Sequence, residues 1–304
     1  MIIKGSNWFV DSAVWIAKIL KVPDIIIGAT LVSLCTTLPE AMVSTSSALK
    51  GNTDMAVGNA LGSIACNTGL VLAIIIIFSR PALHQRKSFQ QKGLLLVFLL
   101  IFIIIIGFWF GEVSRYAGII LLAILGIYIY NNIRESLRSE TTPTTQPLET
   151  SKVNVIQNTI LFIIGILFTV SGANLLVTNG EIIARIFGVP DLIVGITMTS
   201  LGTSLPELIT AFTAIRKKAH NLSIGNVLGA NILNIILVIG MTSVILPIRI
   251  DQSMTHFHLP FILLLVGSGV SFAFTNKYHF RRRNGILLMF TYAMYLGLII
   301  INVL

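Results

Sequence analysis

The stretch VPDIIIGATLVSLCTTLPE at residues 22–40 recurs almost unchanged as VPDLIVGITMTSLGTSLPE at residues 189–207. A second pair follows at the same distance in each copy, GNALGSIACN at 58–67 and GNVLGANILN at 225–234. One offset of 167 residues aligns the two halves without a gap, and 20 of the 51 positions from 22 to 72 are identical. Self-similarity of this length indicates a fold built from two copies of one unit.

The composition places most of this chain in a lipid bilayer. Of the 304 residues, 55% are hydrophobic and only 11% are charged, which is too apolar for one soluble core to hide. Apolar stretches of the length that crosses a bilayer as a helix, about 20 residues, recur along the whole chain, and the alternation typical of a membrane barrel is missing. We expect an all-α integral membrane protein with ten transmembrane helices, at residues 2–20, 25–49, 55–79, 93–111, 115–132, 155–178, 191–215, 221–246, 258–275 and 284–303.

The repeat predicts that the two halves are inverted in the membrane. Each half contributes five segments, and after an odd number of crossings the second copy enters from the opposite side. We expect one repeat at 1–133, a second at 154–304, and between them a polar linker at 134–153 that is rich in Pro and Thr. The first helix is about half as long as its counterpart. Either the start of the protein lies further upstream, which we favour, or this helix is truncated.

The net charge of +9 follows from membrane topology. If the N-terminus lies outside, the inner side carries sixteen of the 21 basic residues and the outer side five. Such an excess is typical of cytoplasmic loops. We expect a multi-pass protein of the cell membrane with a cytoplasmic linker. Its surroundings are then the lipid bilayer, without nucleic acid and with no obligatory protein partner evident.

Two of the twelve acidic residues, Glu40 and Glu207, fall at the centre of apolar segments. An ionisable group at this depth costs about 3 kcal/mol and by default marks a pathway or a binding site. No Lys or Arg is expected at the same depth, so a cation or a proton must balance each acid. Pro39 and Pro206 precede the two acids, and a proline inside a helix frees the carbonyl four residues earlier. We expect broken helices whose backbone oxygens face a cation.

Oxygen-bearing side chains accompany both acids at helical spacing. On one helix face they occur at i, i+3, i+4 and i+7, with the acid last. The following segments carry a second row that begins at Asn59 and at Asn226, where each amide could reach the neighbouring Glu or bond between helices. Hard oxygen donors favour Ca²⁺ and Na⁺ over softer metals. The first rows are Ser33, Thr36, Thr37 and Glu40 with Ser200, Thr203, Ser204 and Glu207, and the second rows are Asn59, Ser63 and Asn67 with Asn226, Ala230 and Asn234.

The paired motifs resemble the α-repeats of the sodium/calcium exchanger branch of the calcium/cation antiporters. TTLPE at 36–40 and GTSLPE at 202–207 carry the resemblance with the two Gly-Asn motifs, and it covers nearly the whole chain. It implies a ten-helix fold, exchange of several Na⁺ for one Ca²⁺, and no cofactor beyond these ions. By position it implies backbone oxygens at Ser33 and Ser200 and side-chain ligands at Thr36, Thr37, Glu40, Ser63, Asn67, Thr203, Ser204, Glu207 and Asn234. Ala230 stands where the family usually has Ser, which leaves the stoichiometry open, and Cys35 replaces the usual Gly.

Three functions are therefore open. The first is a secondary antiporter that exchanges Na⁺ for Ca²⁺ by alternating access, because two ions that share ligands bind alternately. The second is a proton/calcium antiporter in which Glu40 and Glu207 are protonated instead. The third is a membrane scaffold that no longer transports. An enzyme is not expected, since the sequence offers neither a cluster of metal-binding histidines nor a nucleophile–base pair.

Overall fold

The computed structural model describes residues 2–20, 22–81, 86–138, 152–186, 202–275 and 279–303. This part of the chain is almost entirely helical. A short antiparallel sheet pairs β1 (Glu112–Val113) with β2 (Ile248–Arg249). The helices are α1 (Ile2–Ile19), α2 (Asp24–Ile27), η1 (Gly28–Val32), α3 (Ser33–Leu49), α4 (Thr53–Cys66), η2 (Asn67–Leu72), α5 (Ala73–Ser79), α6 (Arg86–Phe110), α7 (Arg115–Arg138), α8 (Lys152–Ile186), α10 (Leu205–Arg216), α11 (His220–Leu233), η3 (Asn234–Ile239), α12 (Gly240–Ile245), η4 (Met254–His258), α13 (Leu259–Thr275) and α14 (Arg282–Val303), where η denotes a π-helix.

Seven helical segments of the described chain are long and apolar enough to cross a membrane. They confirm an all-α, multi-pass membrane protein. The expected segments 2–20, 191–215 and 284–303 are not among the seven, and residues 187–201 lie outside the described part, so the count of ten stays an expectation. The seven are Asp24–Leu49, Thr53–Ser79, Arg86–Phe110, Arg115–Glu135, Asn154–Gly172, His220–Ile245 and Met254–Thr275.

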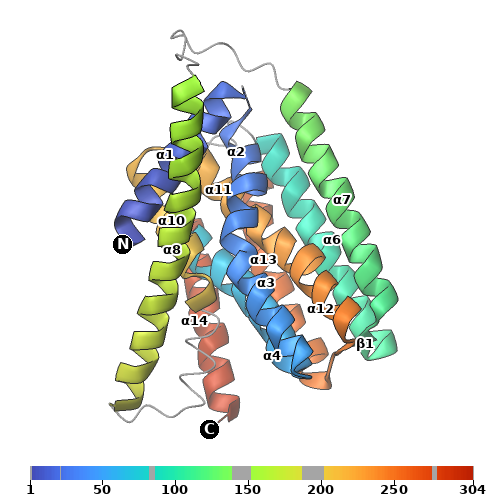
Figure 1. The fold of residues 1–304 in the computed structure, drawn as a ribbon. Helices are drawn as coiled ribbons and strands as arrows, with labels where there is room; N and C mark the ends of the chain where they lie inside the picture. The colour runs from blue at the N-terminus through green and yellow to red at the C-terminus, as the bar shows by residue number, and fades with distance from the viewer. Residues whose placement is uncertain are drawn as a thin grey trace.

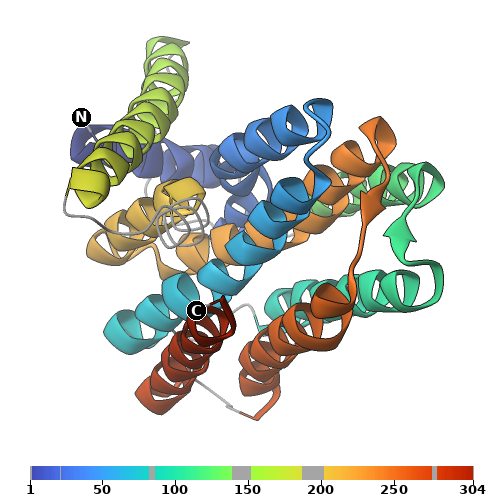
Figure 2. The same cartoon turned by 90° about the horizontal axis from the view of Figure 1, so that it is seen from below.

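Two of these segments form the centre of the bundle. The most apolar stretches of Thr53–Ser79 and His220–Ile245 are 72% and 78% buried, whereas that of Arg115–Glu135 is 28% buried. Figures 1 and 2 show α8 with α1 at one edge of the bundle and α6 with α7 at the opposite edge. The peripheral helices therefore present apolar side chains to lipid, while α4 and α11 are enclosed by protein.

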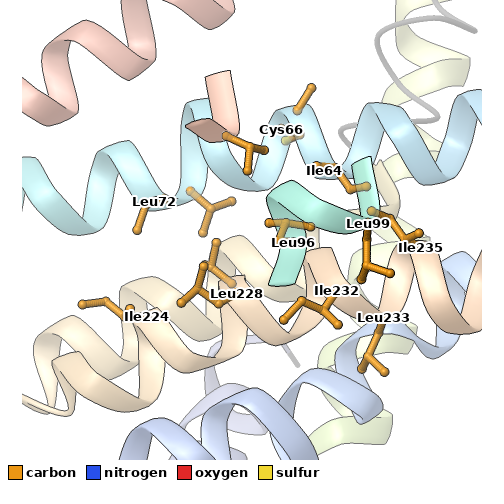
Figure 3. Close-up of a cluster of buried hydrophobic side chains, with 14 of the residues drawn as sticks. Ile64, Cys66, Leu72, Leu96, Leu99, Ile224, Leu228, Ile232, Leu233 and Ile235 are labelled. Carbon is orange, nitrogen blue, oxygen red and sulfur yellow. The ribbon is translucent and has the colours of Figure 1, made fainter. Parts of the chain in front are cut away.

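Apolar packing holds the two central helices together. Figure 3 shows Ile64 of α4, Leu96 and Leu99 of α6, and Leu228 and Ile232 of α11 gathered into one cluster. Each of these side chains is at most 3% exposed. Because close-packed interiors resist displacement, this cluster fixes α4 and α11 relative to each other and to α6.

The first helix and its counterpart differ in length as the sequence predicts, with 18 residues in α1 and 35 in α8. They pack closely, because a Cβ atom on Gly5 would lie 2.8 Å from the carbonyl oxygen of Gly165. The rings of Phe9 and Phe162 lie beside this crossing with their centroids 4.8 Å apart. The expected linker is shorter than 134–153 at both ends, since α7 continues to Arg138 and α8 begins at Lys152.

The helices that carry the two acids deviate from a regular α-helix, but not as the prolines predict. α3 runs without interruption through Pro39, and the irregular turn lies before it, in η1. α10 begins at Leu205, so that Pro206 stands in its first turn, where a proline removes no helical hydrogen bond. The break expected at Pro39 is therefore wrong in position. The helix accommodates the proline, and the widened turn lies further upstream, in η1.

Candidate cation-binding site

Glu40 and Glu207 are buried at the centre of the molecule, each with 0% of its surface exposed. Within the part of the chain that the structure describes, none of their four carboxylate oxygens has a hydrogen-bond partner. The two groups lie near enough for their charges to interact. Ion pairs in the described part are formed elsewhere, by Lys92 and Lys217 with other acids. A buried carboxylate pair without a protein counter-charge needs a bound cation or protons.

Equivalent pairs of elements surround the two acids. Glu40 lies on α3, which contacts α4 and η3, and Glu207 lies in the first turn of α10, which contacts α11 and η2. The π-helices η2 and η3 begin at Asn67 and Asn234, which are separated by the repeat offset of 167 residues. π-helical turns are rare and often occur at functional sites. Their presence at the same point of both copies therefore makes these asparagines candidate functional residues.

In the described ranges of the chain, four predicted ligands have polar side-chain atoms without hydrogen-bond partners. These atoms are the hydroxyl oxygens of Thr37 and Ser204 and both amide atoms of Asn67 and Asn234. All four side chains are at most 1% exposed. More than nine in ten buried polar groups in proteins have a hydrogen-bond partner. A cluster of orphaned oxygens beside two carboxylates is therefore the arrangement that a bound cation would complete.

Three other predicted hydroxyls, those of Thr36, Ser63 and Thr203, are hydrogen-bonded between the two halves of the chain. The Thr36 hydroxyl donates to the Asn226 Oδ1 at 3.1 Å, and the Thr203 hydroxyl donates to the Asn59 Oδ1 at 3.1 Å. Ser63 and Thr203 hydroxyls lie 3.2 Å apart. We expected each Asn amide to face the neighbouring Glu or another amide, but both amide oxygens face a threonine of the other half.

The backbone oxygens implied by the resemblance are only partly within the described residues. The carbonyl of Ser33 accepts a 3.3 Å hydrogen bond from Thr36, and Ser33 is fully buried. Ser200 lies outside the described part of the chain. Ala230 is fully buried at the position equivalent to Ser63, so this point of the second half offers no hydroxyl.

The site combines two carboxylates with hydroxyl, amide and carbonyl oxygens. Oxygen-only sites of this kind suit Na⁺ and Ca²⁺, and two negative charges match one Ca²⁺. A polytopic helical bundle with such a site at its centre defines a membrane transporter of cations.

The chain belongs to the sodium/calcium exchanger protein family, whose sequence pattern matches residues 1–134 and 157–301. It is therefore a cation/calcium antiporter and not an enzyme. The chain is 26% identical to the sodium/calcium exchanger MaX1 of Methanosarcina acetivorans, over 97% of this chain and 94% of MaX1. It is 31% identical to the inner membrane protein YrbG of Escherichia coli, over 83% and 78% of the two chains.

The fold is also similar to a solved structure of the sodium-calcium exchanger NCX_Mj soaked with 10 mM Na⁺ and zero Ca²⁺. The TM-score is 0.84 at 27% identity, and the match covers 97% of this chain and 94% of NCX_Mj.

Proposed function

We propose that this protein exchanges Na⁺ for Ca²⁺ by alternating access, with Glu40 and Glu207 sharing one central cation site. The observation that carries the proposal is the pair of fully buried carboxylates whose oxygens have no hydrogen-bond partner among the described residues. Its proposed ligands are Ser33, Thr36, Thr37, Glu40, Ser63, Asn67, Ser200, Thr203, Ser204, Glu207 and Asn234.

Charge balance explains why such a carrier would exchange ions instead of leaking them. An empty site holds two negative charges at membrane depth, and each uncompensated charge costs about 3 kcal/mol. A bound Ca²⁺, or Na⁺ ions in its place, would cancel this charge and allow the loaded protein to reorient. Because both ions would use the same oxygens, each would displace the other.

We propose that the fold has ten transmembrane helices in two inverted repeats. Contacts that recur between equivalent residues, 167 positions away in the other half, support the inverted repeat. Val113 pairs with Ile248 in the sheet, and the equivalent residues, Phe280 and Pro81, share a 3.3 Å backbone hydrogen bond. The N-terminus would lie outside, and the linker between α7 and α8 would lie in the cytoplasm.

Close glycine packing repeats in the same way. A Cβ atom on Gly118 would lie 2.9 Å from the carbonyl oxygen of Gly240, and one on Gly285 would lie 2.7 Å from that of Ala73. The two glycines, and the two carbonyls, are each separated by the repeat offset. The two halves therefore use the same close approach at equivalent points, which supports two copies of one unit.

The surrounding oxygens favour Na⁺ over protons as the coupling ion. A proton on each acid would supply one donor per carboxyl group. The orphaned oxygens of Thr37, Ser204, Asn67 and Asn234 would mostly stay unpartnered, at about 1–3 kcal/mol for each buried polar group. A Na⁺ ion coordinates several oxygens at once and would satisfy them together.

Calcium uptake into proteoliposomes tests the proposal. Vesicles holding the wild-type protein should accumulate Ca²⁺ under an outward Na⁺ gradient, and Glu40→Gln and Glu207→Gln should abolish this uptake. Glu112→Gln, a change in the loop strand β1 away from the site, is the matched control and should transport normally. Uptake under an outward proton gradient alone would instead support the proton/calcium antiporter. Absence of uptake under both gradients would support a scaffold.

A further inference from the structure

We propose that Asn59 and Asn226 are positioning residues that aim the hydroxyls of Thr203 and Thr36 at the bound cation. This inference rests on the proposed function, because it concerns the same central site. Both asparagines are at most 3% exposed, and each accepts its hydrogen bond from a threonine of the other half of the chain at 3.1 Å. The sequence motifs assign neither asparagine to a cation.

Hydroxyl chemistry gives these bonds a direct effect on cation binding. A threonine hydroxyl has one hydrogen and two lone pairs. If the hydrogen points at an asparagine oxygen, the threonine oxygen can turn a lone pair toward a cation, even where the Ser63 hydroxyl lies 3.2 Å from that of Thr203. If the hydrogen loses that acceptor, it can turn toward the site and repel the cation. Partners of this kind orient metal ligands and typically change metal affinity about 10- to 100-fold when they are removed.

Asn226 also controls whether a backbone oxygen is available. The Thr36 hydroxyl lies 3.1 Å from the Asn226 Oδ1 and 3.3 Å from the Ser33 carbonyl oxygen. One hydrogen cannot serve both acceptors fully. Donation to Asn226 leaves the Ser33 carbonyl open to a cation, whereas loss of Asn226 would return the hydrogen to that carbonyl. Asn226 thus holds this hydrogen where it neither faces the cation nor occupies the Ser33 carbonyl.

The first half holds its asparagine more firmly than the second half. The Asn59 Nδ2 donates to the Glu40 carbonyl oxygen at 3.3 Å and to the Ser44 hydroxyl at 2.9 Å. These bonds fix the amide with its oxygen toward Thr203. The Asn226 Nδ2 has no hydrogen-bond partner among the residues that the structure describes, and Ala211 occupies the position equivalent to Ser44. Only the Asn59 amide is therefore anchored at both ends.

Double-mutant cycles on the full-length protein test the proposal, with the Kd for Ca²⁺ measured by titration calorimetry in detergent. Asn226→Leu and Thr36→Val should each raise this Kd about 10-fold or more. Because both substitutions break the same bond, the Kd of the double variant should be little higher than the higher Kd of the two single variants. Asn226→Leu combined with Thr203→Val, which breaks two different bonds, should multiply the separate effects. The effect of Asn59→Leu should overlap with that of Thr203→Val, which breaks the same bond, and should multiply with that of Thr36→Val.

Each outcome separates this inference from a structural role and from the proposed function. The inference would be wrong if the two substitutions had additive effects in both kinds of double variant, those that break one shared bond and those that break two different bonds. Asparagines that only hold helices together would show no such difference between the two threonines. Ser44→Ala, which releases the Asn59 amide without removing a ligand, should raise the Kd about threefold and serves if Asn59→Leu misfolds. Wild-type protein that binds Ca²⁺ but fails to exchange it for Na⁺ would refute the proposed function and leave this inference standing. Wild-type protein that binds no Ca²⁺ would refute both the proposed function and this inference.

Discussion

Replacing Gly229 with alanine tests how closely the two halves must approach at the site. Gly229 lies on α11 against η1 and the start of α3. A Cβ atom there would lie 2.4 Å from the Ser33 hydroxyl oxygen, 2.6 Å from the Ala29 Cα and 2.7 Å from the Ala29 carbonyl oxygen. Ordinary contacts with a Cβ begin at 3.4 Å. Because two of the three neighbours are backbone atoms, a side-chain rotation cannot relieve the clash, and the backbones must separate by about 0.8 Å.

A separation of this size exceeds what the site tolerates. Ca²⁺–oxygen distances span only about 2.3–2.6 Å. If α3 and α11 move apart by about 0.8 Å, the proposed ligands on α3 and Asn234, which directly follows α11, cannot both stay in contact with one ion. Overpacking of a closely packed region costs about 1–3 kcal/mol. If this cost falls on the ion-bound state, the Kd for Ca²⁺ rises about 5- to 150-fold.

Calorimetric titration of purified Gly229→Ala with Ca²⁺ measures this effect directly. Gly126→Ala is the matched control, because a Cβ atom at Gly126 on the exposed side of α7 meets nothing within 4 Å, and it should bind Ca²⁺ as the wild type does. A Gly229→Ala protein with wild-type affinity would refute the claim that this close approach sets the ligand distances.

Further substitutions test other parts of the structure. Tyr128→Phe removes the 2.7 Å bond from the buried Tyr128 hydroxyl to the Ala29 carbonyl and should lower the free energy of unfolding by about 1–3 kcal/mol, measured by thermal unfolding in detergent; an unchanged melting temperature would contradict this. Ala230→Ser adds a hydroxyl to the site and should lower the Na⁺ concentration at half-maximal exchange, whereas an unchanged Na⁺ dependence would place this position outside the coordination shell. Asp11→Asn breaks an ion pair with Lys217 in which the Asp11 side chain is 62% exposed. It should change stability by less than about 1 kcal/mol, so a larger loss would show that α1 depends on this contact.

The membrane fold was predictable because its signals are local and repeated. Apolar segments of bilayer length and the motif pair at residues 22–40 and 189–207 define the helices that carry the acids. The widened turns η1, η2 and η3 were not predictable from the proline positions. A π-helical turn depends on the packing of neighbouring helices more than on one residue type, and Pro39 fits within α3 without ending it.

The burial of both acids was predictable from their depth in apolar segments, and the orphaned oxygens of Asn67 and Asn234 agree with their spacing. The hydrogen bonds from Thr36 to Asn226 and from Thr203 to Asn59 were missed. They join residues 190 and 144 positions apart, and helical spacing describes only one helix at a time. The asparagine repeated at the start of both second motifs was the available signal, since a buried amide inside an apolar segment needs a hydrogen-bond partner.

Equilibrium binding of Ca²⁺ to the purified wild-type protein, Glu40→Gln and Glu207→Gln, with Glu112→Gln as the control, tests the central claim most directly. If the two buried acids form one site, either substitution alone should raise the Kd for Ca²⁺ at least about 30-fold, the effect of removing one partner from a buried charge pair. The control should bind as the wild type does. Wild-type affinity in either of the two single variants would show that the acids do not share a cation.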